Sequence, residues 1–270
     1  MIHIKKGQIS FYWKSVKDVF SFSFSLGKRT KRTRVFYLLS FLPVVMALVI
    51  KFAQYFYGRT DIQGIYIFSN IIMMFYLQFL ILLLALFFGS SVCLDELEGK
   101  TLTYLTTRPV PKPAIILGKY AAYSVLIVLM TGAGVVFSFL ILNCENLGDV
   151  SLYKILLRDI SVLCLGLISY ASFFTFLGTF LKKSVMVGLI FGFGWENVVQ
   201  YFPGSTQKFT IAHYLKSLLP SLNTGRFSFL LFRLEPTSPQ AAVGMLFLIT
   251  GFFLVLACVI FSFKEYLFED

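Results

Sequence analysis

Long apolar runs separated by short polar segments dominate this chain of 270 residues. A membrane-spanning helix takes about 20 predominantly apolar residues. The pattern predicts spans at residues 35–57, at residues 65–94, between Lys119 and Glu145, between Asp159 and Lys182, from Val185 to an interruption at Glu196, and between Glu235 and Lys264. We therefore expect an all-α membrane protein with six transmembrane helices.

The same pattern divides the chain into three parts. Residues 1–34 form a basic N-terminal segment, residues 35–264 the six-span domain, and residues 265–270 a short tail. Residues 95–113 join spans two and three, and residues 195–239 form an outer loop or re-entrant region. Because Glu196 limits the fifth run to about half of a full span, residues 195–220 are expected to return as a re-entrant or interfacial helix.

The N-terminal segment predicts an amphipathic helix. One face carries Ile9, Tyr12, Trp13, Val16, Val19 and Phe20, and the other carries Lys14, Ser15, Lys17 and Asp18. Such a helix is expected to lie in the membrane interface with its cations toward lipid headgroups. Residues 1–34 contain no long apolar region, so no cleavable signal peptide is expected.

Composition supports a lipid environment, since 57% of residues are hydrophobic and only 14% are charged, against about 25% in soluble domains. The 24 Lys and Arg residues outnumber the 13 Asp and Glu residues. They favour an orientation with both termini in the cytoplasm, in the plasma (inner) membrane. Nucleic acid is not an expected partner, because the positive charge flanks spans and does not form a soluble face.

Candidate enzyme chemistry is scarce. The four cysteines are scattered, and His3 and His213 are far apart without metal-ligand spacing, so no metal site is expected. Gly99-Lys100-Thr101 ends like a phosphate-binding loop, but Leu94 occupies the position of the leading glycine. A lipid-phosphatase spacing from Lys100 to Arg108 fails by one residue. We expect no catalytic residues and no cofactor in this chain.

One compact charged segment lies between the second and third spans. Asp95, Glu96 and Glu98 begin a predicted helix over residues 95–107, where carboxylates complement the helix dipole. Arg108 and Pro109 then open a proline-rich stretch that stops the helix, because proline cannot continue one. The segment reads as a short amphipathic helix followed by a stiff connection, although a plain solvated loop is the alternative.

The order of motifs here resembles the corresponding segment of ABC type-2 permeases, the membrane subunits of ATP-binding-cassette transporters. The motifs are Asp95-Glu96, Gly99-Lys100-Thr101-Leu102, Arg108-Pro109-Val110 and Leu117-Gly118-Lys119-Tyr120. The basic N-terminal helix, the six spans and the long loop before the last span also resemble that family. The resemblance implies a permease subunit, of the exporting kind, with a cytoplasmic coupling helix between spans two and three.

By the same resemblance, that helix docks on a separate ATPase subunit, which holds ATP and Mg. The implied coupling residues are Asp95, Glu96, Glu98, Gly99, Lys100, Thr101, Arg108 and Pro109. A second permease subunit, identical or homologous, completes the expected assembly in membrane lipid. The alternative is a non-transport membrane scaffold or assembly factor, which would need no nucleotide-binding partner; an intramembrane enzyme comes third.

Glu196 is the most conspicuous polar residue within the apolar runs, because a charge at mid-membrane costs about 2.5–3.5 kcal/mol. Three interpretations stay open. Glu196 pairs with a buried donor such as Gln78, Asn197 or a tyrosine; it lies near the outer boundary, where the chain leaves the bilayer; or it lines a substrate or proton path. Glu196, its neighbour Trp195 and Gln78 are therefore the candidate polar site of the spans.

Overall fold

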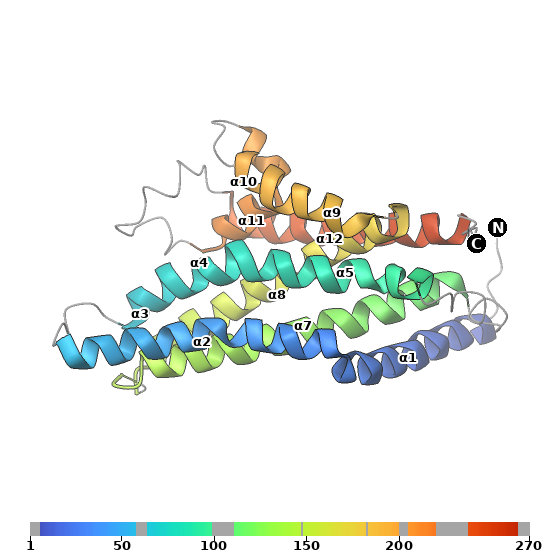
Figure 1. Ribbon diagram of the computed structural model, residues 1–270. Helices are drawn as coiled ribbons and strands as arrows, with labels where there is room; N and C mark the ends of the chain where they lie inside the picture. The colour runs from blue at the N-terminus through green and yellow to red at the C-terminus, as the bar shows by residue number, and fades with distance from the viewer. Residues whose placement is uncertain are drawn as a thin grey trace.

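The computed structural model describes residues 6–57, 64–98, 111–146, 148–181, 183–199, 205–219 and 237–263, and every regular element in these ranges is a helix (Figure 1). Five described helices are long and apolar enough to cross a membrane: Lys31–Phe56, Met73–Leu94, Lys112–Leu142, Val150–Phe180 and Pro239–Phe263. The predicted fifth span corresponds to a shorter apolar helix, Ser184–Trp195. The all-helical membrane architecture is confirmed, whereas a sixth full-length span is not found among the described residues.

The centre of the bundle consists of three helices, α5 (Ile81–Glu98), α7 (Lys112–Leu142) and α8 (Val150–Phe180). Two further helices, α2 (Lys31–Tyr57) on α7 and α12 (Pro239–Phe263) mainly on α8, cover this centre and leave most of their own surface exposed. We call the end where α5 stops and α7 starts the α5–α7 end. The opposite end, where α7 stops and α8 starts, is the α7–α8 end.

Helices α5 and α8 approach each other most closely, and glycine makes this approach possible. A Cβ atom on Gly89 of α5 would lie 2.8 Å from the Ala171 carbonyl oxygen of α8. A Cβ atom on Gly178 of α8 would lie 2.8 Å from the Ser90 carbonyl oxygen of α5. Small residues let helix backbones pack tightly in membranes, so α5 and α8 form one closely packed pair.

The second span changes character along its length. Its half toward the α7–α8 end consists of α3 (Gly64–Ile67), η1 (Phe68–Ile72), α4 (Met73–Phe75) and η2 (Tyr76–Leu80). Segments η1 and η2 are π-helical: the Met73 amide donates to the Phe68 carbonyl, and the Ile81 amide donates to the Tyr76 carbonyl. The other half is the uninterrupted α5. The apolar pattern predicted the span but gave no sign of the π-helical turns.

Helix α1 (Lys6–Arg29) runs beside the first half of α7 (Figure 1). A Cβ atom on Gly118 would lie 2.8 Å from the Val19 side chain, so this glycine admits α1. Within the protein Ser15 is buried, whereas Trp13 is 64% exposed. The side of α1 that packs in the bundle therefore includes Ser15 and leaves Trp13 on the outer surface.

The fifth apolar run forms a short hairpin. The first arm of the hairpin consists of α9 (Ser184–Leu189), the π-helical η3 (Ile190–Trp195) and α10 (Glu196–Val199). After residues 200–204 the chain continues through η4 (Ser205–Phe209) and α11 (Ile211–Ser217). Helix α9 packs against α5 and α8, and α11 folds back onto α8 and α12. Every residue of α11 is buried, although it includes a histidine and a lysine.

Candidate functional site

The first candidate region is the charged segment at the α5–α7 end. Helix α5 continues without a break through Asp95 and Glu96 to Glu98, so the backbone of these residues extends the second span. Their side chains lie outside the described part of the structure. Five more predicted coupling residues also lie outside the described residues: Gly99, Lys100, Thr101, Arg108 and Pro109.

On the far side of this segment, the chain resumes at Pro111 and starts α7 at Lys112. Pro111 has an extended backbone (φ −60°, ψ 128°), and its carbonyl accepts the Ala114 amide at 2.9 Å. Pro113 occupies the first turn of α7, where its missing N–H costs nothing. The Lys112 ammonium donates to the Ser262 carbonyl of α12 at 3.4 Å. The segment is therefore anchored by α5 on one side and by α7 and α12 on the other.

The second candidate region surrounds Glu196, which is 1% exposed. Its Oε1 accepts a hydrogen bond from the Ile211 amide, and its Oε2 accepts one from the Ala212 amide, both at 3.2 Å. The Tyr170 hydroxyl of α8 also hydrogen-bonds this carboxylate, and the Lys216 ammonium acts on it electrostatically. Glu196 thus places its negative charge at the N-terminus of α11, where the helix dipole and free amides favour an anion.

Several other polar groups in and beside α11 are also hydrogen-bonded. Thr210 caps the helix, because its hydroxyl accepts the His213 amide at 3.3 Å. His213 Nε2 lies 2.9 Å from Thr237 Oγ1, just before α12 begins. The Ser217 hydroxyl donates to the His213 carbonyl at 2.8 Å and accepts the Thr237 amide at 3.3 Å. These contacts join the hairpin to the start of the last span.

The other two predicted members of the polar site, Trp195 and Gln78, belong to η3 and η2. Trp195 is 51% exposed and stacks on Phe191 with ring centroids 6.3 Å apart, so it faces outward. Gln78 belongs to η2. Its neighbour Phe79 lies against Phe193 of η3, with ring centroids 5.9 Å apart. The structure gives Glu196 a tyrosine partner, as one interpretation expected. Its two amide partners are backbone groups that no side-chain pattern could reveal.

Asp159 is a buried carboxylate that sequence reasoning treated only as the border of the fourth span. Helix α8 starts earlier, at Val150, where the Asp149 side chain accepts the Ser151 amide at 3.0 Å. Asp159 is fully buried, and its Oδ1 accepts from Nε and Nη2 of Arg158, each at 3.4 Å. Its Oδ2 meets no hydrogen-bond partner among the described residues. The capping motif around Asp149 was the signal that could have extended the helix.

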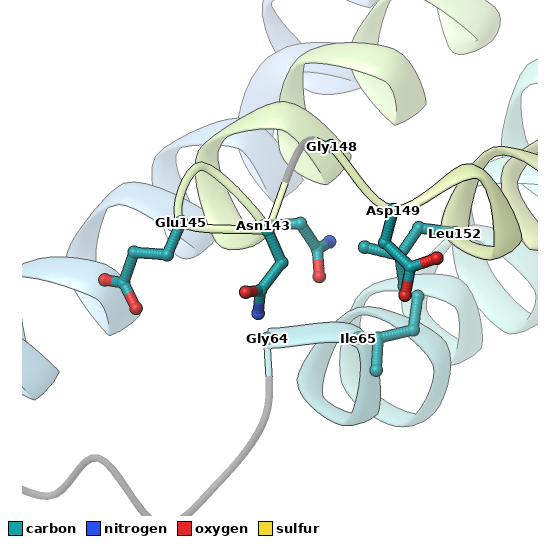
Figure 2. A pocket seen from close by; sticks show the side chains of 8 residues that line it. Gly64, Ile65, Asn143, Glu145, Gly148, Asp149 and Leu152 are labelled. Carbon is teal, nitrogen blue, oxygen red and sulfur yellow. The ribbon is translucent and has the colours of Figure 1, made fainter.

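A polar hollow of about 480 Å³ opens at the α7–α8 end (Figure 2). Its lining comprises Gly64, Ile65, Asn143, Glu145, Asn146, Gly148, Asp149 and Leu152. Both carboxylates are already engaged, since Glu145 pairs with Lys51 at 2.7 Å and Asp149 caps α8. The hydrogen bonds from Ser151 hold the pKa of Asp149 below its ordinary value. Across the described ranges, no cluster of three or more His, Cys, Asp or Glu residues could hold a metal ion.

Comparison with protein families finds one match relevant to this geometry. The family model described as "ABC-2 family transporter protein" matches residues 28–195. The matched region runs from the end of α1 through the charged segment to the last residue of η3. The curated proteins give no match to the chain.

Proposed function

The chain belongs to the ABC-2 family of transporter proteins, and from this membership we propose that it is the permease subunit of an ATP-binding-cassette transporter. It is a multi-pass membrane protein with five long apolar helices in its described part. It provides the path for a substrate, and a separate ATPase subunit supplies the energy. This division of labour fits a chain in which no nucleotide-binding loop occurs.

One structural observation carries the proposal. The charged segment is bounded by the last turn of α5 and the first turn of α7, at the same end of the bundle. Both helices belong to the packed centre, and α5 is closely packed on α8. A force applied to residues 95–113 from outside the membrane would therefore reach the centre of the bundle directly, through continuous helix.

The charged segment is also chemically suited to docking on another protein. Asp95 and Glu96 belong to the last turn of α5 and Arg108 precedes the prolines in sequence, so the segment carries both charge signs, as charge-assisted hydrogen bonds to a partner require. Nucleotide binding and hydrolysis would move the ATPase subunit as a rigid body. The predicted helix start at Asp95 is wrong, because α5 runs on to Glu98. In this mechanism residues 95–108 are the coupling segment, which begins in the last turn of α5, and Glu98, Gly99, Lys100, Thr101 and Pro109 complete the contact surface.

The wider assembly follows from the exposed helices. Helices α2 and α12 present mostly apolar outer surfaces, which membrane lipid and a second permease subunit would cover. The cations of residues 28–34, where α1 ends and α2 begins, favour a cytoplasmic α5–α7 end according to the positive-inside rule. We propose export across the plasma membrane as the direction of transport, with α1 at the cytoplasmic interface.

The decisive test is association with an ATPase. The chain would be purified in mild detergent from its native membrane, and co-purifying proteins would be identified by mass spectrometry. An ATPase subunit whose ATP hydrolysis changes when it is reconstituted with this chain in vesicles is the expected result. A chain that purifies without any ATPase, and leaves the hydrolysis of the ATPase from its own gene neighbourhood unchanged, would favour a membrane scaffold.

A further inference from the structure

Three helices meet at one tight contact in the middle of the bundle. A Cβ atom on Gly134 of α7 would lie 2.5 Å from the Tyr76 hydroxyl oxygen of η2 and 2.6 Å from the Ser40 carbonyl oxygen of α2. Tyr76 and Ser40 are both fully buried. Because no side chain larger than hydrogen fits at Gly134, this point fixes the spacing of α2, α7 and the second span.

The Tyr76 hydroxyl also connects the three helices chemically. It donates to the Ser40 carbonyl at 3.3 Å and lies within hydrogen-bonding reach of the Ser138 hydroxyl, one turn beyond Gly134 on α7. Pro43 lies inside α2 close to the same level, and proline removes a helical hydrogen bond there. The contact therefore lies where α2 is least able to resist bending.

The second span changes from π-helical to regular helix just after Tyr76, which is the first residue of η2. Toward the α5–α7 end, α5 is a regular helix of 18 residues, about 27 Å long at 1.5 Å per residue. Toward the α7–α8 end, residues 64–80 contain the π-helical η1 and η2. π-Helical turns are rare and occur frequently at functional sites. The π-helical η3 lies beside η2, because the ring centroids of Phe79 (η2) and Phe193 (η3) are 5.9 Å apart.

Resting on the proposed function, we infer that Tyr76, Ser40 and Gly134 form a fulcrum for the second span. Displacement of Glu98 by the ATPase turns α5 as a rigid arm about this contact. The π-helical η2, which joins this contact to α5, then moves against η3 at Phe79 and opens or closes the substrate path at that level. Tyr76 and Gly134 act as positioning residues, because they set the pivot and touch neither ATP nor the docking surface.

The test measures movement of the π-helical half in the complex with the ATPase in vesicles. A Phe79→Cys substitution reports this movement, because Phe79 is 36% exposed on η2. Its modification by a membrane-permeant maleimide is followed by mass spectrometry, without nucleotide and with ATP plus orthovanadate. Trapping is expected to change the labelling rate in the otherwise unmodified chain.

Gly134→Ala is expected to abolish that change while ATPase association is retained, although overpacking at this contact should lower the thermal stability in detergent. Gly132→Ala is the matched control on the same helix, since a Cβ atom there meets nothing within 4 Å, and it should keep the response. Adding Tyr76→Phe to Gly134→Ala removes one of the two collisions and should restore part of the response. Tyr76→Phe alone should weaken it, which keeps the test informative if Gly134→Ala does not fold.

The outcomes separate the two proposals. A complex in which Gly134→Ala responds like Gly132→Ala, or in which vanadate trapping leaves Phe79→Cys labelling unchanged, overturns the fulcrum and leaves the permease assignment intact. Failure of the unmodified chain to associate with an ATPase removes the permease assignment and the fulcrum together.

Discussion

Glu196 Oε2 accepts the backbone amide of Ala212 at 3.2 Å, across a separation of sixteen residues. The second carboxylate oxygen accepts the Ile211 amide at the same distance. One side chain at the top of the short hairpin therefore binds the first turn of the helix that folds back. This explains how a carboxylate is tolerated among apolar helices: two amides, Tyr170 and Lys216 compensate its charge.

Removing the Glu196 carboxylate should destabilise the protein strongly. Glu196→Ala leaves the Ile211 and Ala212 amides without their acceptor and removes the negative charge that acts on the buried Lys216; removing one member of a buried charged network costs about 3–5 kcal/mol. Glu196→Gln keeps one acceptor oxygen and should cost about 1–3 kcal/mol. Thermal unfolding in detergent measures the order of stability of these variants. Glu145→Gln is the control, because the exposed ion pair between Glu145 and Lys51 contributes at most about 1 kcal/mol. Equal losses of stability in all three variants would contradict the role of Glu196 as the cap of α11.

Neutralising Asp159 should not weaken the fold. Asp159→Asn removes a buried charge whose only described donor is the adjacent Arg158, at 3.4 Å. A charged side chain at the centre of a membrane-spanning helix costs about 2.5–3.5 kcal/mol. The Asp159→Asn variant is therefore expected to be as stable as the unmodified protein, or more stable. Thermal unfolding and membrane yield of Asp159→Asn, compared with Asp159→Ala, provide the measurement. A large loss of stability in both would reveal a cationic partner that the described residues do not contain.

Opposite ends of the bundle should face opposite sides of the membrane. The exposed Cys144 follows α7 at the α7–α8 end, and Glu98→Cys places a thiol at the α5–α7 end. A membrane-impermeant maleimide is expected to label Cys144 in intact cells and the introduced cysteine only in inverted vesicles. The buried Cys93 is an internal control that should stay unlabelled in both. Labelling at position 98 from outside would end the coupling proposal.

Charge reversal in the charged segment should loosen the ATPase while leaving the chain inserted. Asp95→Lys with Glu96→Lys inverts the acidic end of α5, and Arg108→Glu inverts the other side. Charge-assisted hydrogen bonds contribute about 1.5–3 kcal/mol each, so at least tenfold weaker association is expected. Lys154→Glu, on α8 near the α7–α8 end, is the control far from the docking surface. Unchanged binding and unchanged ATP hydrolysis in the reversed variants would refute this docking mode.

The close pairing of α5 and α8 should depend on glycine. Gly178→Leu would drive a side chain into the Ser90 backbone, which already lies 2.8 Å from a Cβ position. Overpacking of this kind costs about 1–3 kcal/mol, or more where backbone must move. A Cβ atom at Gly244 on α12 meets nothing within 4 Å. Gly244→Leu should therefore change the stability by about 0.5 kcal/mol or less. Comparable unfolding temperatures for the two variants would contradict the packing described here.

The spans could be predicted from sequence because their signal is local. Apolar runs bounded by Lys, Asp or Glu correspond to α2, α5, α7, α8 and α12, and the family motif around Asp95 and Arg108 agrees with the family match. Helix ends were less accurate, since α7 begins at Lys112, whereas the third span was expected to begin after Lys119. The fifth run was too short for a span, and the structure gives it the form of a hairpin.

The details of the site could not be predicted, because they depend on groups distant in sequence or on the backbone. Glu196 binds amides of residues 211 and 212, and amides are identical at every non-proline position. The burial of Ser15 depends on the packing of α1 against helices distant in sequence, mainly α7. The π-helical turns depend on tertiary packing, so neither Phe68 nor Tyr76 marks them in the sequence.

The two π-helical turns of the second span affect how the chain can change in length. Each turn holds one residue more than an α-helical turn closed by an i+4 hydrogen bond, so deleting one residue within η1 or η2 can be absorbed by restoring the regular helix. The same deletion within α5 would rotate everything after it by about 100° around the axis. Asp95 and Glu96 would then face a different side of the bundle. Residue loss near the α7–α8 end therefore leaves the docking end in register.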